Sequence, residues 1–245
     1  RQGGLMFGRV APGTTVTLDD EPVPVAADGR FAIGFGRDET GRRRLVAAPP
    51  GEPPDVRELD IAPRQWNIER VDGLPPETVT PPDDVLQRIE REAALVADAR
   101  SQRRDTADWQ SGFISPAEGR ISGVYGSQRV LNGEPRRRHF GLDIAAPTGT
   151  PVMAPAAGIV MLAEPDLFYS GGTIIIDHGA GLSSTFLHLS EVSVTTGDAV
   201  AQGAPIGRIG ATGRASGPHL DWRMNWLDRR VDPQPLLDLP AETLP

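Results

Sequence analysis

The chain of 245 residues contains no cysteine and no lysine, so all 25 of its basic residues are arginine. Without cysteine there is no thiol nucleophile, no disulfide and no metal site built from thiolates. Without lysine there is no Schiff-base enzyme and no P-loop, which needs a lysine to contact phosphate. The chemistry open to this chain therefore relies on histidine, carboxylates, hydroxyl groups and arginine.

Positive charge and long apolar runs are also scarce. The formal net charge is −8, so we expect no nucleic acid partner, because binding to phosphates needs an excess of basic side chains. The longest apolar runs, such as residues 158–163, fall far below the roughly 20 residues that cross a bilayer, and no transmembrane segment is predicted. The chain begins with Arg1 rather than Met, which leads us to expect that a signal segment has been removed.

Glycine and proline are abundant instead, with 28 and 24 residues, whereas aromatic residues make up only 5% of the chain. This composition predicts a mainly β protein with many short strands and turns. Residues 1–71 alternate short apolar stretches with turn residues, and Asp28-Gly29 is a strong hairpin signal. We interpret this segment as a small antiparallel β-sandwich. Because it contains no histidine, we expect a binding or spacer role rather than metal chemistry.

Residues 72–112 are predicted to connect this segment to a second domain. Prolines make an extended linker of residues 72–82. A connecting helix is predicted from Asp83 to about Arg104, because apolar residues recur there at i, i+4 spacing. The apolar stripe is short, so we expect the helix to pack on a neighbouring domain rather than to form a coiled coil. Residues 113–238 then form an antiparallel β domain, and residues 239–245 a C-terminal tail.

The second domain holds all four histidines of the chain. His139 and Asp143 are four residues apart, and Gly141 between them allows a bend, so both side chains could bind one metal ion. This spacing is also common by chance. In the segment 217–222, polar and apolar residues alternate as on a strand, which predicts that His219 and Asp221 project side by side from one face.

The remaining candidates have both structural and functional interpretations. His188 lies on an otherwise apolar strand, where a histidine is usually a core residue. His178 ends a buried strand, and we interpret it as structural. Tyr125 and Arg129 lie on a glycine-rich stretch, where they are either substrate contacts or solvent-facing loop residues.

Eight short motifs follow one another along the domain. They are Phe113-Ile114-Ser115-Pro116, Gly123-Val124-Tyr125-Gly126, His139-x-Gly-x-Asp143, Gly149-Thr150-Pro151-Val152-x-Ala154-Pro155-x-x-Gly158, Asp177-His178-Gly179-x-Gly181, Phe186-x-His188-Leu189-Ser190, Gly197-Asp198-x-Val200-x-x-Gly203-x-x-Ile206-Gly207 and Gly217-Pro218-His219-Leu220. In this order they resemble the LytM-like, lysostaphin-type M23 zinc metallopeptidases over roughly residues 113–238.

The resemblance implies a compact antiparallel β core with a groove over one sheet, one bound Zn²⁺ ion and hydrolysis of peptide bonds in peptidoglycan. By position, His139 and Asp143 match two zinc ligands. His188 and His219 match the pair that handles the attacking water and the developing oxyanion. Position 221 matches the third zinc ligand, which is a second histidine in the family and is Asp221 here.

Asp221 is the one departure at the metal. A carboxylate is an accepted zinc ligand, but a second one adds negative charge and makes zinc a weaker Lewis acid. We expect a zinc endopeptidase that cleaves peptidoglycan stems or cross-bridges in the periplasm or at the cell wall. The alternative is a catalytically silent module that binds peptidoglycan or regulates an amidase. In a third hypothesis, residues 3–71 and the helix block the groove until a regulatory protein moves them.

Overall fold

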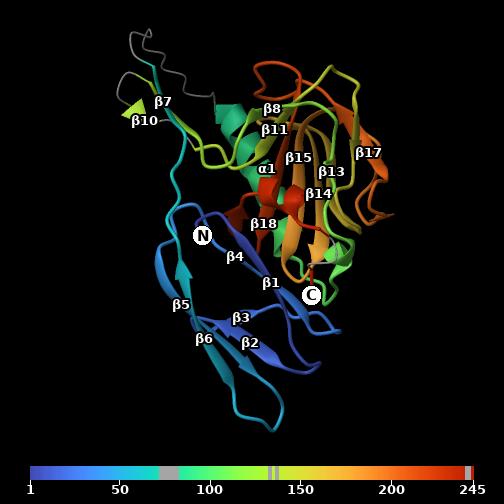
Figure 1. Ribbon diagram of the computed structural model, residues 1–245. Coiled ribbons are helices and arrows are strands. Elements are labelled where there is room, and N and C mark those ends of the chain that lie inside the picture. Colours follow the sequence, from blue (N-terminus) through green and yellow to red (C-terminus); the bar gives the residue numbers. More distant parts are fainter. Residues whose placement is uncertain (72–82, 132–133, 136–137, 241–243) are drawn as a thin grey trace.

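The computed structural model describes residues 1–71, 83–131, 134–135, 138–240 and 244–245. Its largest element is an antiparallel sheet of ten strands in the order β16-β13-β14-β15-β18-β11-β8, with β12, β17 and β19 attached (Figure 1). These strands are β8 (Arg120–Gly123), β11 (Leu142–Ala145), β12 (Pro151–Met153), β13 (Gly158–Leu167), β14 (Gly171–Gly179), β15 (Leu182–Val192), β16 (Ala199–Val200), β17 (Pro205–Ile209), β18 (His219–Trp226) and β19 (Arg229–Val231). The mainly β fold predicted from composition is confirmed.

The N-terminal segment is an antiparallel β unit, as predicted. Strand β1 (Leu5–Arg9) pairs with β4 (Arg30–Gly34), and a four-stranded sheet has the order β3-β2-β5-β6. The strands of this second sheet are β2 (Thr15–Leu18), β3 (Glu21–Val23), β5 (Gly41–Ala48) and β6 (Asp55–Ile61). The Asp28-Gly29 turn precedes β4, and Gly29 has φ +89°, which favours glycine there.

One apolar core runs through both parts of the chain. The ring of Phe7 on β1 lies 4.7 Å from that of Trp109, between centroids. Gly34 on β4 fits closely against Trp226 and Val231, where a Cβ would lie 2.6 Å from Trp226 Cβ. The two parts therefore stabilise each other. The domain boundary near residue 71 stays a prediction.

A small sheet joins the N-terminal segment to the histidine-containing domain. Strand β7 (Ile68–Val71) runs parallel to β9 (Gln128–Leu131), and β10 (Glu134–Pro135) pairs with the other edge of β9. In Figure 1 the chain leaves β6 and runs along the molecule to reach this sheet. The predicted proline linker, residues 72–82, lies outside the described residues.

Helix α1 (Asp83–Ser101) packs on the large sheet, which confirms the expectation for the connecting helix. Val96 and Ala99 contact an apolar cluster that includes Ile175 of β14. Ile175 is opposite Thr185 of β15, and Thr185 is opposite Arg223 of β18, so these three side chains lie on one sheet face. The helix thus covers part of the face that carries the site described below. Within the described residues, no helix is both long and apolar enough to cross a membrane.

Candidate metal centre

Two neighbouring strands and one loop bring His139, Asp143 and Asp221 together. Asp143 on β11 is directly opposite Asp221 on β18, so the two carboxylates project from one face. The loop that carries His139 is fixed by two backbone hydrogen bonds, from His139 N to Ser127 O and from Gly126 N to His139 O. One potential ligand atom from each of the three residues lies within 4.8 Å of the other two. The three metal ligands expected from the resemblance therefore converge.

Two glycines make room for the carboxylates. A Cβ on Gly141 would collide with Asp221 Oδ1, and a Cβ on Gly123 would collide with Asp143 Oδ2. The sequence suggests Gly141 for a bend between the two ligands. The structure gives Gly141 a second role, because only a residue without a side chain lets the loop that carries His139 lie directly against Asp221.

The geometry fits a divalent cation. His139 Nε2 and Asp143 Oδ1 are buried and lie 3.2 Å from each other, and neither has another hydrogen-bond partner. In the neutral imidazole with no hydrogen on Nε2, two acceptor atoms would face each other there at a cost in free energy, and a cation bound between them would satisfy both. One imidazole and two carboxylates form a donor set that suits zinc. These residues can therefore hold a metal ion.

Asp221 has a partner that the sequence analysis missed. The carboxylate is only 3% exposed, and both of its oxygens lie 3.0 Å from Nε of Arg223, whose Nη2 also donates to Oδ2. His219, Asp221 and Arg223 alternate along β18, so they share one face. The same alternation that paired His219 with Asp221 could have identified Arg223 from the sequence.

Arg223 also changes the charge at the site. Burial acts to raise the pKa of Asp221, but the adjacent guanidinium outweighs it and holds this pKa below its usual value. Asp221 is therefore ionised. With His139 neutral, the two carboxylates and Arg223 sum to a charge of minus one, as one carboxylate and two neutral histidines would. Arg223 thus offsets the negative charge that a second carboxylate adds to the zinc site, so the expected weakening of the Lewis acid is reduced.

His139 carries the opposite pKa perturbation. Burial acts to lower its pKa, but the Asp143 carboxylate and, after it, Asp221 outweigh burial and raise this pKa above the usual 6.5. In the absence of metal the two carboxylates thus favour a proton on His139. A metal ion and this proton compete for the same nitrogen.

His188 and His219 lie beside the three candidate ligands, with ring centroids 4.9 Å apart. His188 Nδ1 is 2.8 Å from Thr212 O, and His219 Nδ1 is 2.8 Å from Gly217 O. A carbonyl oxygen only accepts hydrogen bonds, so each Nδ1 carries the hydrogen and each Nε2 is unprotonated in the neutral ring. The pair predicted from the resemblance is thus brought together with both tautomers fixed.

The backbone of His188 explains how it reaches this pair. Its neighbour Leu187 is opposite Asp221 and shares its face, so regular alternation would turn His188 into the core. Instead His188 has φ +66°, a left-handed conformation that is uncommon for a residue with a side chain and is concentrated at functional sites. This conformation breaks the alternation and places the ring next to His219. Burial lowers the pKa of His188, so its ring is neutral at neutral pH.

His178 and Tyr125 have structural roles. His178 is fully buried, with Nδ1 2.7 Å from Ala157 O and Nε2 2.8 Å from Ser184 Oγ, which confirms its interpretation. Tyr125 is 1% exposed and donates its hydroxyl hydrogen to Arg230 O. Both interpretations of Tyr125, as a substrate contact and as a solvent-facing residue, are therefore wrong. The side chain of Arg129 lies outside the described residues.

A groove of about 840 Å³ opens over the candidate metal centre. His139, Asp143 and His219 line it, and strand β8 forms one wall. Asn67 and Glu69, at the start of the small sheet, form part of another wall, so the N-terminal segment shapes this groove. A ligand of peptide size can thus reach the site.

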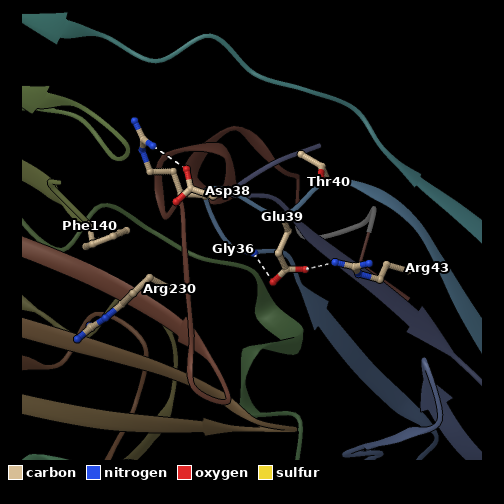
Figure 2. Close-up of a pocket in the computed structure, with 8 residues that line it drawn as sticks. Gly36, Asp38, Glu39, Thr40, Arg43, Phe140 and Arg230 are labelled. Atoms are coloured by element: carbon tan, nitrogen blue, oxygen red, sulfur yellow. Dashed lines mark hydrogen bonds and ion pairs between the residues drawn. The ribbon is translucent and has the colours of Figure 1, made fainter.

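A second cavity of about 550 Å³ lies between the loop 36–40, Arg43 at the start of β5, Phe140 and Arg230. Its charged groups are largely paired with one another. Figure 2 shows Glu39 between the backbone nitrogen of Gly36 and the guanidinium of Arg43. This cavity holds none of the predicted ligands.

Comparisons with known proteins match most of the histidine-containing domain to a peptidase family. The profile of Peptidase family M23 matches residues 137–233. The chain is 40% identical over 86 residues to the peptidoglycan DD-endopeptidase ShyA of Vibrio cholerae, covering 35% of this chain and 20% of ShyA. It is 37% identical over 117 residues to the DD-carboxypeptidase/endopeptidase Mpg of Neisseria meningitidis serogroup B, covering 48% and 26% of the two proteins. The chain thus spans a fifth to about a quarter of these curated relatives.

A solved structure extends the similarity to the N-terminal part. The crystal structure of a putative peptidase M23 from Pseudomonas aeruginosa superimposes with a TM-score of 0.75 and 29% sequence identity. The superposition covers 96% of this chain and 94% of that one, so it includes most of the N-terminal strands.

Proposed function

Because the chain contains a peptidase M23 domain, we propose that it is a zinc-dependent endopeptidase that hydrolyses peptide bonds in peptidoglycan stems or cross-bridges. The family match and the endopeptidase names of its relatives support a peptidase. One observation supports zinc dependence: two buried potential ligand atoms, His139 Nε2 and Asp143 Oδ1, lie 3.2 Å apart next to Asp221, with no other hydrogen-bond partner.

Three residues would hold the metal and two would act on the reacting groups. His139, Asp143 and Asp221 would bind one Zn²⁺, which when bound supplies a Lewis acid for the scissile carbonyl and an activated water. His188 is neutral at neutral pH, so its unprotonated Nε2 can accept a proton from the attacking water. His219 Nε2, once protonated, can donate a hydrogen bond to the oxyanion that develops on the carbonyl oxygen.

The substrate would lie in the groove over the metal centre. Strand β8 and residues 216–219 flank the ligands, so an extended peptide in the groove would present its backbone to His219. Peptidoglycan peptides are the substrate class that the names of the relatives support. The protein would then act in the periplasm or at the cell wall, where this polymer lies.

A metal analysis combined with digestion of peptidoglycan tests the proposal. We expect one zinc per wild-type chain, and loss of zinc and of muropeptide cleavage in His139→Ala and Asp143→Ala. The matched control is Asp60→Ala, because Asp60 is a highly exposed carboxylate on β6, far along the chain from the ligands. Equal zinc content in wild type, His139→Ala and Asp143→Ala would contradict the metal site.

The second candidate function is a silent module that binds peptidoglycan or regulates an amidase. The observation that favours it is the Asp221 carboxylate, whose two oxygens already contact Arg223. Zinc binding and sacculus binding without any change in the muropeptide profile would favour this module over the endopeptidase.

A further inference from the structure

The contact between Arg223 and Asp221 goes beyond the roles assigned so far. We propose that Arg223 is a positioning residue of the metal centre, which orients the Asp221 carboxylate and cancels its charge so that the pair acts as a neutral third ligand. This inference rests on the proposed zinc site. It assigns a role to a residue that itself touches neither metal nor substrate.

Arg223 fixes the orientation of the Asp221 carboxylate. An arginine fork that contacts both carboxylate oxygens fixes the carboxylate plane more strictly than one hydrogen bond does. Arg223 contacts both oxygens of Asp221, while the Gly141 backbone closes over Oδ1. A carboxylate has about four lone-pair sites, and the contacts from Arg223 occupy three of them, one on Oδ1 and two on Oδ2. The site that remains on Oδ1 is thus held where it can meet a cation bound by His139 and Asp143.

Arg223 also offsets negative charge at the candidate metal centre. Asp143 and Asp221 are opposite each other on adjacent strands, where two negative charges repel. Arg223 offsets one of them and leaves a net charge of minus one for the cation. If an imidazole replaced the Asp221 carboxylate while Arg223 remained, the protein groups would sum to zero, and the cation would face an unpaired guanidinium.

The surroundings of Arg223 tie it to Asp221. Its side chain is 23% exposed, and its strand partner Thr185 accepts a hydrogen bond from Arg100 of helix α1, at 3.2 Å. A second guanidinium therefore lies near Arg223. Burial and, after it, this repulsion lower the pKa of Arg100 to about 10. If the Asp221 carboxylate were removed, Arg223 would lose the negative charge that now balances it. Two neighbouring guanidinium groups, those of Arg100 and Arg223, would then lie next to the metal centre without that carboxylate.

Zinc affinity in paired variants tests the inference. We measure it by competition with a chromophoric chelator in wild type, Asp221→His, Arg223→Met and the double variant. Asp221→His alone should weaken zinc binding at least about tenfold, because one unit of positive charge remains unpaired a few ångströms from the ion. The double variant restores the net charge of minus one. Its affinity should return to within about twofold of wild type, the usual scatter of additive effects.

Two controls separate this coupling from general effects of substitution. Arg64 pairs with the buried Asp232 at 2.6 Å and is also 23% exposed, so Arg64→Met added to Asp221→His should restore nothing. Arg223→Lys added to Asp221→His keeps the positive charge and should also stay weak. Arg223→Gln serves as a second neutral replacement if the methionine variant does not fold.

The outcomes separate the two proposals. The role of Arg223 is overturned, while the zinc site stands, by either of two results. One is that Asp221→His binds zinc as tightly as wild type. The other is that the double variant binds zinc no better than Asp221→His. Wild type that binds no more zinc than Asp143→Ala overturns the zinc site and, with it, this inference.

Discussion

Strand β18 has two faces that differ in how their side chains are satisfied. Leu220, Trp222 and Met224 are fully buried, and the core packs around them. On the other face His219, Asp221 and Arg223 contact their neighbours through charge and hydrogen bonds, next to the buried pair of His139 Nε2 and Asp143 Oδ1. The core face contributes apolar burial to stability, whereas the site face keeps polar groups in arrangements that cost stability until a ligand binds.

Different segments of the chain cover the two faces of the large sheet. The N-terminal strand β4 covers the core face, since Gly34 lies against Trp226. Helix α1 covers part of the site face through Ile175 and its neighbours. Thus the first hundred residues contact both faces of the large sheet, and changes on the two faces should affect different measurements.

Removal of residues 1–82 should have the largest effect. The deletion takes away β1 and β4, which leaves Trp109, Trp226 and Val231 without part of the core that now buries them. The fragment should lose much of its cooperative unfolding transition in a urea titration followed by tryptophan fluorescence. A fragment that unfolds as cooperatively as the full chain and still binds zinc would show that residues 1–71 are separable, as the sequence predicts.

Substitution of adjacent residues on β18 separates the two faces directly. Trp222→Ala should cost about 3–5 kcal/mol of unfolding free energy, because it empties a large volume in the core and removes the hydrogen bond to Ser184 Oγ. Asp221→Ala should instead lose most of its zinc affinity. We expect the zinc titration and the urea midpoint to rank the two variants in opposite orders. The same order in both measurements would mean that the faces are not independent.

How much of this site the sequence predicts depends on which rule each residue follows. His219 and Asp221 follow regular strand alternation, so their common face could be predicted, and Arg223 obeys the same rule. His188 does not, because φ +66° turns it out of the alternation that Leu187 follows. A conformation imposed by tertiary contacts leaves no period in the sequence, so only the resemblance to a family indicated that His188 joins the site.

The antiparallel fold and the turn at Asp28-Gly29 could likewise be predicted from local patterns. The contacts between distant segments could not. The parallel pairing of β7 with β9 and the burial of Tyr125 under Arg230 O depend on how far-apart residues pack, which composition does not encode.

Substitution of His188 tests the site face without disturbing the metal ligands. His188→Ala should lower the rate of peptide hydrolysis by about 10²–10⁴-fold, the usual contribution of a general base, and leave zinc content unchanged. His188→Asn should be more stable than His188→Ala, since asparagine tolerates positive φ better than alanine, but it should not restore the rate. Loss of zinc in both variants would place His188 among the ligands instead.

The smallest expected effect is a pH dependence that reverses when metal binds. In metal-free protein the pKa of His139 is raised above 6.5, so its proton stabilises the fold fully below pH 6.5, and this stability is lost as the pH rises through the folded-state pKa. His178 and His188 have lowered pKa values, because burial disfavours their charged forms, so their contributions change below pH 6.5 and leave the window above it to His139. With no cysteine in the chain, few other groups titrate there.

In EDTA, the melting temperature should therefore fall as the pH is raised from 6.5 to about 8.5, a window set by the ordinary histidine pKa and the direction of the His139 shift. Zinc needs the neutral imidazole, so zinc affinity should rise over the same window. The control is His139→Asn, in which the slope in EDTA should flatten because no proton binds at that position. A slope that persists in His139→Asn would assign the titration to another group, and a zinc affinity that falls with pH would contradict His139 as a ligand.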